Sequence, residues 1–217
     1  MLVLAIDTST PAVTAGVSTV SGEGVAVLAE RVTLNARAHG ELIMPHALDA
    51  LREAGVALGE LDAIVCGVGP GPFTGLRAGM ATAAALGHGL GVAVYPVCGL
   101  DAIAAGAVSD EPFLVVTDAR RREVYWAAYD PAKRRVDGPH VQAPAEFGVP
   151  VAAGDGARLY ADRLGVRVIE PYYPATAGLV TVAATELLAK AAPAPLTPLY
   201  LRRPDAVEPA ARKRVTA

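Results

Sequence analysis

Aromatic residues are scarce in this sequence: Phe, Trp and Tyr together make up 5% of its 217 positions. Hydrophobic residues nevertheless account for 53%, mostly as small and aliphatic side chains. Such a composition predicts a well-filled core and excludes an intrinsically disordered chain. Small side chains also let helices and strands approach closely, so we expect tightly packed elements. This length allows one large domain or two small ones.

Cysteine and excess positive charge are scarce as well. The two cysteines, Cys66 and Cys98, lie among apolar residues and form no Cys-x-x-Cys pair, which favours buried, reduced thiols. The formal net charge is −3 and no long basic stripe is present. Tight binding of nucleic acid by the chain alone is therefore not expected.

Long hydrophobic runs are also missing. Every run of 18 or more residues contains Gly, His or a charged side chain, so no membrane span is expected. The N-terminal MLVLAIDTST lacks the charged region of a signal peptide and reads as a first strand. We therefore expect a cytoplasmic protein.

The order of apolar patterns predicts an α/β architecture that occurs twice. In the first half we expect strands at 2–6, 12–20 and 25–33, a helix at 40–54, a strand at 62–68, a helix at about 76–90, a strand at 92–97 and a helix from about Leu100. In the second half we expect a strand from Phe113, a hairpin leg at about 134–142, a strand at 150–153, a helix at 155–164, a strand at 166–170 and a helix at 177–190.

The two halves align at a constant offset of 111 residues, which places Asp118 on Asp7. We therefore expect a duplicated two-lobed α/β fold. Its predicted parts are an N-terminal lobe at 1–108, a C-terminal lobe at 109–206 and a flexible tail at 207–217.

Asp7, Thr8, Ser9 and Thr10 directly follow the first buried strand. Such a turn can hold a phosphate through backbone N–H groups and a hydrated cation through Asp7. Local hydrogen bonding within the turn explains the same residues. Asp118 would face Asp7 across a cleft, which resembles the phosphate-gripping layout of the actin, sugar-kinase and heat-shock ATPase superfold.

The second half departs from that superfold after Asp118, because Ala119 and Arg120 stand where glycine is usual. The run Arg120 to Arg122 fits either a phosphate contact or a solvated turn. Gly154-Asp155-Gly156 fits either a purine contact or an ordinary turn before a helix. The candidate phosphate or nucleotide cleft comprises Asp7, Thr8, Ser9, Asp118, Arg120, Gly154 and Gly156.

Metal ligands and a nucleophile cannot be assembled from sequence neighbours. His39 and His46 are seven residues apart, about 10.5 Å along a helix, which is too far to share one ion. No Gly-x-Ser-x-Gly is present, and no base adjoins either cysteine. We expect no metal, no cofactor and no catalytic group.

The segment GPGPFTGLRAG at 69–79 predicts a tight strand-to-helix turn with Thr74 as the N-cap, but it lacks the Lys-Ser/Thr ending of a P-loop. Each glycine inside a helix costs about 1 kcal/mol relative to alanine, so another backbone is expected to lie close. That backbone belongs either to the chain's own sheet or 40–54 helix, or to a partner subunit. The small residues recur every four positions at Gly75, Gly79, Ala83 and Gly87.

Five motifs together resemble the TsaB family, formerly called YeaZ. They are LAIDTST near the N-terminus, HGELIMPHALDAL at 39–51, GVGPGPFTGLRAG at 67–79, DARRREVYWAAYD at 118–130 and PLYLRRPDA at 198–206. The match runs from Met1 to about Ala206, and GPG-x-FTG-x-R is its specific part. One departure is Pro72, where the family usually has serine.

The resemblance implies an actin/sugar-kinase/heat-shock-ATPase-like (ribonuclease H-like) fold without catalytic activity. It implies a heterodimer with TsaD, the metal-bearing relative, joined by the ATPase TsaE. That complex transfers a threonylcarbamoyl group to the adenosine next to the anticodon of tRNA, and tRNA is contacted only through the complex. This chain lacks the His-x-x-x-His pair of TsaD, which supports an accessory role.

The resemblance also implies a docking surface on the first two helices, at about 40–54 and 74–90. The residues assigned to it are Leu42, Ile43, His46, Leu51, Phe73, Thr74, Gly75, Arg77, Gly79, Met80, Ala83, Leu86 and Gly87. Self-association through the same surface is expected when the partner is absent. Two other readings remain: a small ATP-binding or ATP-hydrolysing enzyme that uses Asp7 and Asp118, and, ranked last, a peptidase.

Overall fold

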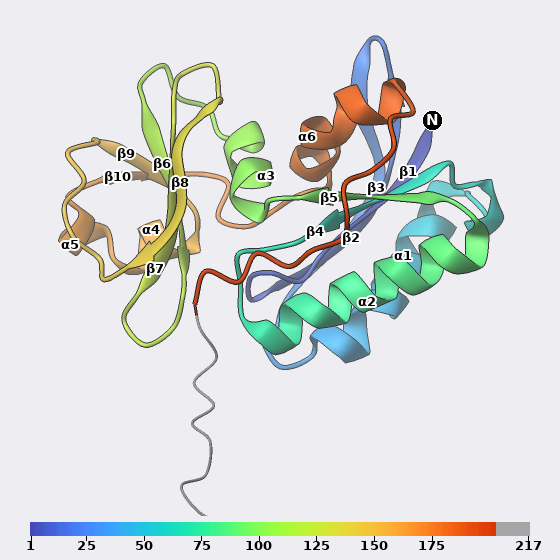
Figure 1. Ribbon diagram of the computed structural model, residues 1–217, viewed down its shortest axis with the longest axis horizontal. Coiled ribbons are helices and arrows are strands. Elements are labelled where there is room, and N and C mark those ends of the chain that lie inside the picture. The colour runs from blue at the N-terminus through green and yellow to red at the C-terminus, as the bar shows by residue number, and fades with distance from the viewer. Residues whose placement is uncertain (203–217) are drawn as a thin grey trace, which may run out of the picture.

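The computed structural model describes residues 1–202 and contains two five-stranded sheets, each covered by helices on both faces (Figure 1). The first sheet has the order β3-β2-β1-β4-β5, with β1 at Leu2–Asp7, β2 at Ala12–Ser21, β3 at Gly24–Leu34, β4 at Ala63–Gly67 and β5 at Ala93–Val97. The second has the order β10-β9-β6-β7-β8, with β6 at Phe113–Asp118, β7 at Val124–Tyr129, β8 at Arg135–Gln142, β9 at Val151–Ala153 and β10 at Arg167–Ile169.

The two sheets repeat one topology. β1 pairs antiparallel with β2 and parallel with β4, which pairs parallel with β5. Likewise, β6 pairs antiparallel with β7 and parallel with β9, which pairs parallel with β10. This confirms the predicted duplicated, two-lobed α/β fold, and Asp7 and Asp118 end equivalent strands.

Helices α1 (His39–Ala54) and α2 (Phe73–Leu90) cover one face of the first sheet. Successive side chains of a strand point to opposite faces, so Leu4 and Ile6 of β1 pack in the core cluster beneath α1 and α2. Val3 and Ala5 pack with Leu179 and Val180 of α6 (Thr176–Leu188), which covers the other face. β1 is therefore buried on both faces, as its continuous apolar run predicts.

The second sheet lies between α3 (Gly99–Gly106) and the short helices α4 (Asp155–Leu159) and α5 (Ala161–Leu164). The predicted single helix at 155–164 is wrong in detail, because Tyr160 has φ −120° and separates the two helices. α6 packs on both the first sheet and α3, so the region predicted as the C-terminal lobe supplies a covering helix to the first sheet.

The C-terminal segment, residues 189–202, runs from α6 back across the first lobe toward the second (Figure 1). Tyr95 Oη donates to the Ala191 carbonyl at 2.9 Å, and the Leu199 N–H donates to the Val68 carbonyl at 2.8 Å. The first bond ties the segment to β5, and the second ties it to the loop between β4 and α2. The predicted tail at 207–217 lies outside the described residues. Within residues 1–202, no helix is long and apolar enough to cross a membrane.

Candidate functional site

The Asp7 turn is closed by bonds within the chain. Asp7 is fully buried, and its carboxylate accepts hydrogen bonds from the backbone N–H and the hydroxyl of Ser9, each at 3.0 Å. The Thr8 hydroxyl donates to the Gly75 carbonyl at 2.7 Å and accepts from the Gly79 N–H at 3.0 Å. The hydroxyls predicted to contact a phosphate are therefore already bonded: that of Ser9 to Asp7 within the turn, and that of Thr8 to the backbone of α2.

Burial raises the pKa of Asp7 from its usual 3.8 to about 7, although the Ser9 hydrogen bonds act in the opposite direction. A raised carboxyl pKa means that the folded protein binds a proton that the unfolded chain has released, so stability falls as pH rises. Between about pH 4 and pH 7 we expect Asp7 to lower the free energy of unfolding by up to about 4 kcal/mol.

Asp7→Asn removes this titration and should flatten that part of the profile, measured by urea unfolding at pH 5 and pH 8. Burial also raises the pKa of Asp155, to about 6, so a smaller slope of the same sign should remain. Asp155→Asn is the matched control and should retain the Asp7 component. An Asp7→Asn profile as steep as wild type would show that Asp7 is ionised throughout.

The second-lobe cleft residues are also used internally. Asp118 forms an ion pair with Arg120 at 3.6 Å, and its backbone N–H donates to Asp155 at 3.3 Å. A Cβ at Gly154 would overlap the Val116 carbonyl oxygen, and one at Gly156 would lie 2.6 Å from the Thr117 carbonyl carbon. Both glycines therefore allow α4 to pack closely on β6. Of the two explanations for Gly154-Asp155-Gly156, the structure supports the turn before a helix over a purine contact.

Three arginines close the hairpin between β6 and β7 in the left-handed backbone region. Arg120, Arg121 and Arg122 have φ values of 63°, 53° and 63°. Such a conformation costs a non-glycine residue on the order of 1–3 kcal/mol and persists only where surrounding contacts impose it. The Arg120 N–H donates to the Asp118 carboxylate at 3.0 Å, and the Glu123 N–H donates to the Arg120 carbonyl at 3.0 Å.

The C-terminal segment reinforces this hairpin. The guanidinium of Arg202 donates to the Ala119 carbonyl at 3.1 Å and pairs with the Glu123 carboxylate. The Ala119 N–H also donates to the Glu123 carbonyl at 2.9 Å. The contacts of Arg202 with Ala119 and Glu123 therefore stabilise the conformation of the hairpin.

The small-residue side of α2 faces the chain's own core. A Cβ at Gly75 would lie 3.0 Å from His39 Nδ1, one at Gly79 would overlap the Thr8 hydroxyl, and one at Gly87 would overlap Val94. Ala83 is completely buried. Of the two interpretations left open for this side of the helix, packing within the chain is the one that the structure supports.

Several residues assigned to the docking surface are consequently inaccessible on this fold: Ile43, Leu51, Gly75, Gly79, Met80, Ala83 and Gly87 are buried. The accessible members are Phe73, Thr74 and Arg77, with Leu42, His46 and Leu86 half-buried. The predicted N-cap at Thr74 is wrong, because α2 begins at Phe73 and Pro72 is the N-cap, with no side-chain capping bond. A proline there cannot supply the hydroxyl that serine would offer to the first turn.

The opposite side of α2 is exposed and almost uncharged. Its exposed residues are Phe73, Thr74, Arg77, Ala81, Ala84, Ala85, His88 and Gly89. Together with Tyr200 they form what we call the docking face. The sequence analysis missed the three alanines, although α2 carries no Asp, Glu or Lys in 18 residues. A helix that is apolar on all sides is normally buried all round.

An aromatic cluster stands at the start of the docking face. Phe73, which is 47% exposed, stacks on Tyr200 with ring centroids 5.3 Å apart. The Arg77 guanidinium lies 3.7 Å from the Phe73 ring centroid and donates to Tyr200 Oη at 2.7 Å. Beside it is a hollow of about 400 Å³, lined by Arg77, Met80, Ala81, Leu196, Pro198 and Tyr200. The C-terminal segment thus extends the exposed side of α2.

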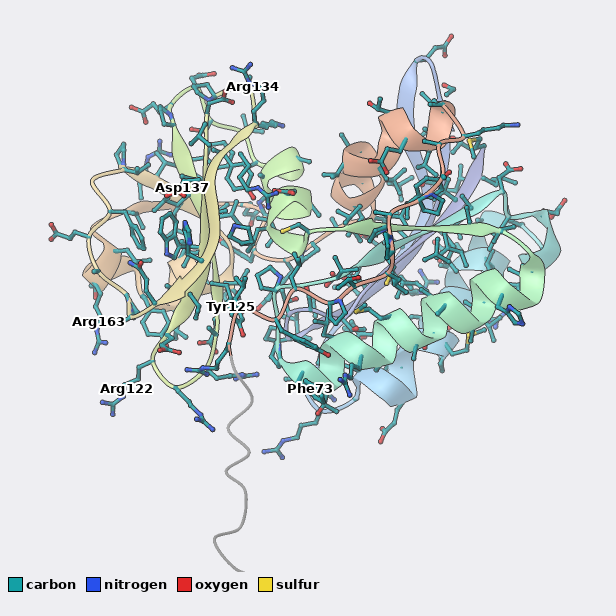
Figure 2. The ribbon with its side chains drawn as sticks, viewed as in Figure 1. Phe73, Arg122, Tyr125, Arg134, Asp137 and Arg163 are labelled. Atoms are coloured by element: carbon teal, nitrogen blue, oxygen red, sulfur yellow. The ribbon has the colours of Figure 1, made fainter. Side chains whose placement is uncertain are left out.

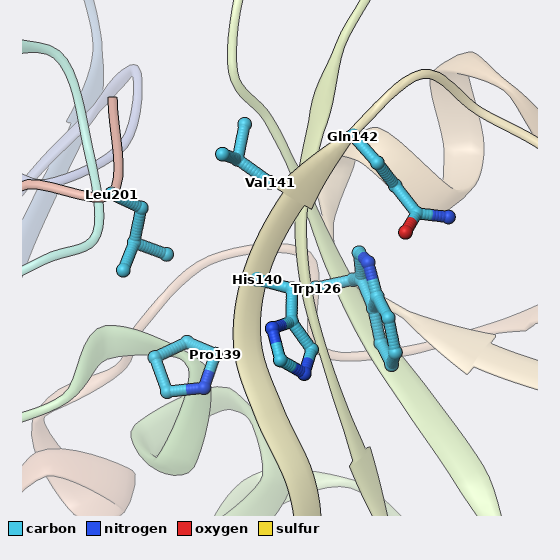
Figure 3. Close-up of a pocket in the computed structure, with 6 residues that line it drawn as sticks. All are labelled: Trp126, Pro139, His140, Val141, Gln142 and Leu201. Carbon is cyan, nitrogen blue, oxygen red and sulfur yellow. The ribbon is translucent and has the colours of Figure 1, made fainter. Parts of the chain in front are cut away.

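A further hollow, of about 450 Å³, lies along β8 (Figure 3). Its lining is Trp126, Pro139, His140, Val141, Gln142 and Leu201. The Trp126 ring packs between His140, at 4.9 Å, and Phe147, at 4.7 Å between centroids. No feature of the sequence indicated this hollow, because it depends on Leu201 returning to the second lobe.

Neither cysteine has the surroundings of a nucleophile. Cys66 and Cys98 are free thiols. Burial raises the pKa of the Cys66 thiol far above its usual range, and burial together with the charge of Asp101 raises that of Cys98 to about 11. Both thiols are therefore protonated at neutral pH. Within residues 1–202, no three His, Cys, Asp or Glu side chains group in a way that could hold a metal ion.

Known proteins resemble this chain in sequence and in structure. The family model of TsaD, tRNA N6-adenosine threonylcarbamoyltransferase, matches residues 27–155. An uncharacterized protein of Mycobacterium tuberculosis is 56% identical over 94% of this chain and 93% of its own length. The tRNA threonylcarbamoyladenosine biosynthesis protein TsaB of Escherichia coli is 35% identical over 59% of this chain and 55% of its own length.

Among solved structures, YeaZ of Pseudomonas aeruginosa aligns with a TM-score of 0.75 and 28% identity over 92% of this chain and 99% of that chain. The repeated sheets and the equivalent Asp7 and Asp118 strand ends define a two-lobed protein of the actin, sugar-kinase and heat-shock ATPase type, related to ribonuclease H. Within that class, the chain belongs to the TsaB (YeaZ) family.

Proposed function

We propose that this chain takes part in threonylcarbamoyladenosine biosynthesis on tRNA as a non-catalytic subunit that binds and supports TsaD. The TsaB relatives in Haemophilus influenzae, Escherichia coli and Bacillus subtilis are tRNA threonylcarbamoyladenosine biosynthesis proteins, which supports this pathway. In this proposal TsaE joins the complex of this chain with TsaD, and tRNA binds to that complex. The docking face supports the binding role.

The observation that carries the proposal is the exposed side of α2, which is almost uncharged apart from Arg77. Ala81, Ala84 and Ala85 face solvent, and short side chains let a second helix approach closely. Burying such a surface is favourable by roughly 25 cal/mol per Å² of apolar area. No described segment of the chain covers these alanines, so we assign that role to a partner.

The partner's fold supports the same surface. The TsaD family model matches residues 27–155 of this chain, a range that includes α1 and α2. From this match we expect TsaD to have a helix pair related to α1 and α2, and two such pairs can pack helix against helix. Self-association of this chain would use the same face and would compete with the heterodimer.

A non-catalytic role agrees with the chemistry of the buried groups. Asp7 is enclosed with its carboxylate bonded to Ser9, and both thiols are protonated at neutral pH. None of them meets the requirement for an accessible, activated nucleophile or base.

The test is reconstituted modification of tRNA with TsaD, TsaE and threonylcarbamoyl adenylate, quantified as modified adenosine. We expect modification to require this chain and to persist with Asp7→Asn or a Cys66→Ser, Cys98→Ser double variant. Full modification without the chain would contradict the accessory role. Loss of modification with Asp7→Asn in an intact complex would instead favour the enzyme that uses Asp7 and Asp118.

A further inference from the structure

The arginine hairpin (Arg120–Arg122) is not explained by the docking face, which lies on the other lobe. All three arginines are exposed, and their consecutive left-handed conformations are unfavourable for residues with a Cβ. The contacts from Asp118 and Arg202 hold that conformation. Strained backbone that is held by surrounding contacts is concentrated at functional sites. The hairpin is therefore a candidate binding site.

A tyrosine and a fourth arginine stand beside the hairpin. Burial raises the pKa of Tyr160, the charge of Asp118 and a hydrogen bond to it add to the rise, and the charges of Arg163 and Arg122 oppose it. The Tyr160 hydroxyl donates a hydrogen bond to the Asp118 carboxylate, which also accepts the Arg120 N–H. The Tyr160 carbonyl accepts the Arg163 N–H at 2.9 Å, so both residues stand beside the hairpin. Figure 2 shows Arg122 and Arg163 at one edge of the second lobe, pointing to solvent, while Arg134 lies at the opposite edge.

The neighbouring carboxylates are engaged elsewhere. Asp118 pairs with Arg120, and Glu123 pairs with Arg202. The buried Asp155 accepts the Asp118 N–H. These three carboxylates are therefore engaged within the hairpin and α4, whereas Asp162, beside Arg163, is exposed. Arg120, Arg121, Arg122 and Arg163 give the edge an excess of positive charge over that one exposed carboxylate.

An unpaired RNA strand presents phosphates and unstacked bases in alternation, and these are the partners of guanidinium groups and aromatic rings. Guanidinium groups bind phosphate oxygens, and aromatic rings stack on splayed bases. We propose that Arg122, Tyr160 and Arg163 contact an unpaired stretch of the tRNA substrate, with the arginines on phosphates and the tyrosine ring against a base. This contact rests on the proposed function in tRNA modification.

A free nucleotide fits the same edge less well. Gly154 and Gly156, which would have to lie against its purine, pack on the backbone of β6. With a net charge of −3 on the whole chain, two phosphate contacts give weak binding alone. The contact should therefore be measured in the complex with TsaD, where the partner supplies the remaining affinity.

The experiment measures tRNA affinity of the complex by fluorescence anisotropy between 50 and about 300 mM salt, a range over which phosphate contacts dominate the change. The test variant combines Arg122→Asn, since asparagine tolerates the left-handed backbone, with Arg163→Gln. We expect tRNA affinity to fall about tenfold at low salt. The slope of log affinity against log salt concentration should become shallower by about 1.4, the value expected for the loss of two phosphate contacts on a single strand.

Matched variants separate the possible causes. Arg134→Gln removes one positive charge at the opposite edge, where Arg134 pairs with Asp130, and should change neither affinity nor slope. Lysine at both 122 and 163 should restore the slope. Tyr160→Phe should bind as wild type, while Tyr160→Ala should lose about tenfold because the stacking ring is gone.

Unchanged affinity in the double variant, or an equal loss in Arg134→Gln, would overturn the proposal. A calorimetric ATP signal that the double variant abolishes, with tRNA affinity intact, would reassign the edge to a nucleotide. If no complex with TsaD forms, the proposed function fails. The same comparison is then made on the chain alone at 50 mM salt, where equal binding of all variants would overturn the contact itself.

Discussion

Replacing Ala84 with glutamate should weaken binding of the TsaD partner by about 100-fold or more, because the close helix contact would bury an unpaired carboxylate. A 100-fold loss corresponds to about 2.7 kcal/mol, which is modest for a buried charge without a partner. Ala84 is exposed in the isolated chain, and glutamate is a good helix former. The folded chain should therefore keep its thermal unfolding temperature. Isothermal titration calorimetry with TsaD of the same organism measures the affinity.

Thr185→Glu is the matched control for this experiment. Thr185 is an exposed residue of α6, on the opposite face of the first sheet, so a glutamate there should leave the affinity unchanged. If both variants bind as wild type, the exposed side of α2 is not the contact. If both lose binding equally, the effect is one of net charge.

Gly79→Ala should destabilise the fold by about 2–3 kcal/mol, a typical cost of overpacking a core. The added methyl group would overlap the Thr8 hydroxyl, which already bonds to the Gly79 N–H and the Gly75 carbonyl. Either the methyl group displaces α2 from the Asp7 turn or Thr8 loses both bonds. Chemical denaturation measures the loss.

Gly89 provides the matched control on the same helix, because a Cβ there would meet no atom within 4 Å. Gly89→Ala should stabilise the protein by up to about 1 kcal/mol, the gain expected for alanine in an exposed helix. Equal effects of the two substitutions would contradict the inward orientation of Gly79. A leucine at Gly79 or Ala83 would accordingly report on core packing and not on docking.

The fold was largely predictable because its signals are local and repeated. Continuous apolar runs identify β1 and β6, and the alignment of Asp118 with Asp7 reveals the duplication that both sheets confirm. The break at Tyr160 was not predictable, because the apolar pattern continues through it. The packing of α6 on the first sheet also depends on a contact between segments far apart in the chain.

The site was predicted less completely, because a sequence pattern identifies a helix side but not the direction in which it faces. Gly79 and Ala83 mark a close contact correctly, yet only the fold shows that the contact is with the Thr8 turn and the core. No sequence pattern marks Ala84 as an exposed residue of the docking face. Tyr200 joins the docking face through a chain reversal that no local signal records.

The central claim is that this chain forms a defined complex with TsaD through the exposed side of α2. Size-exclusion chromatography with light scattering on an equimolar mixture tests it most directly. The account predicts one species whose mass is the sum of one TsaD and one 22.2 kDa chain, and two separate species with Ala84→Glu. Two separate species with the wild-type chain at micromolar concentration, or an unchanged complex with Ala84→Glu, would contradict it.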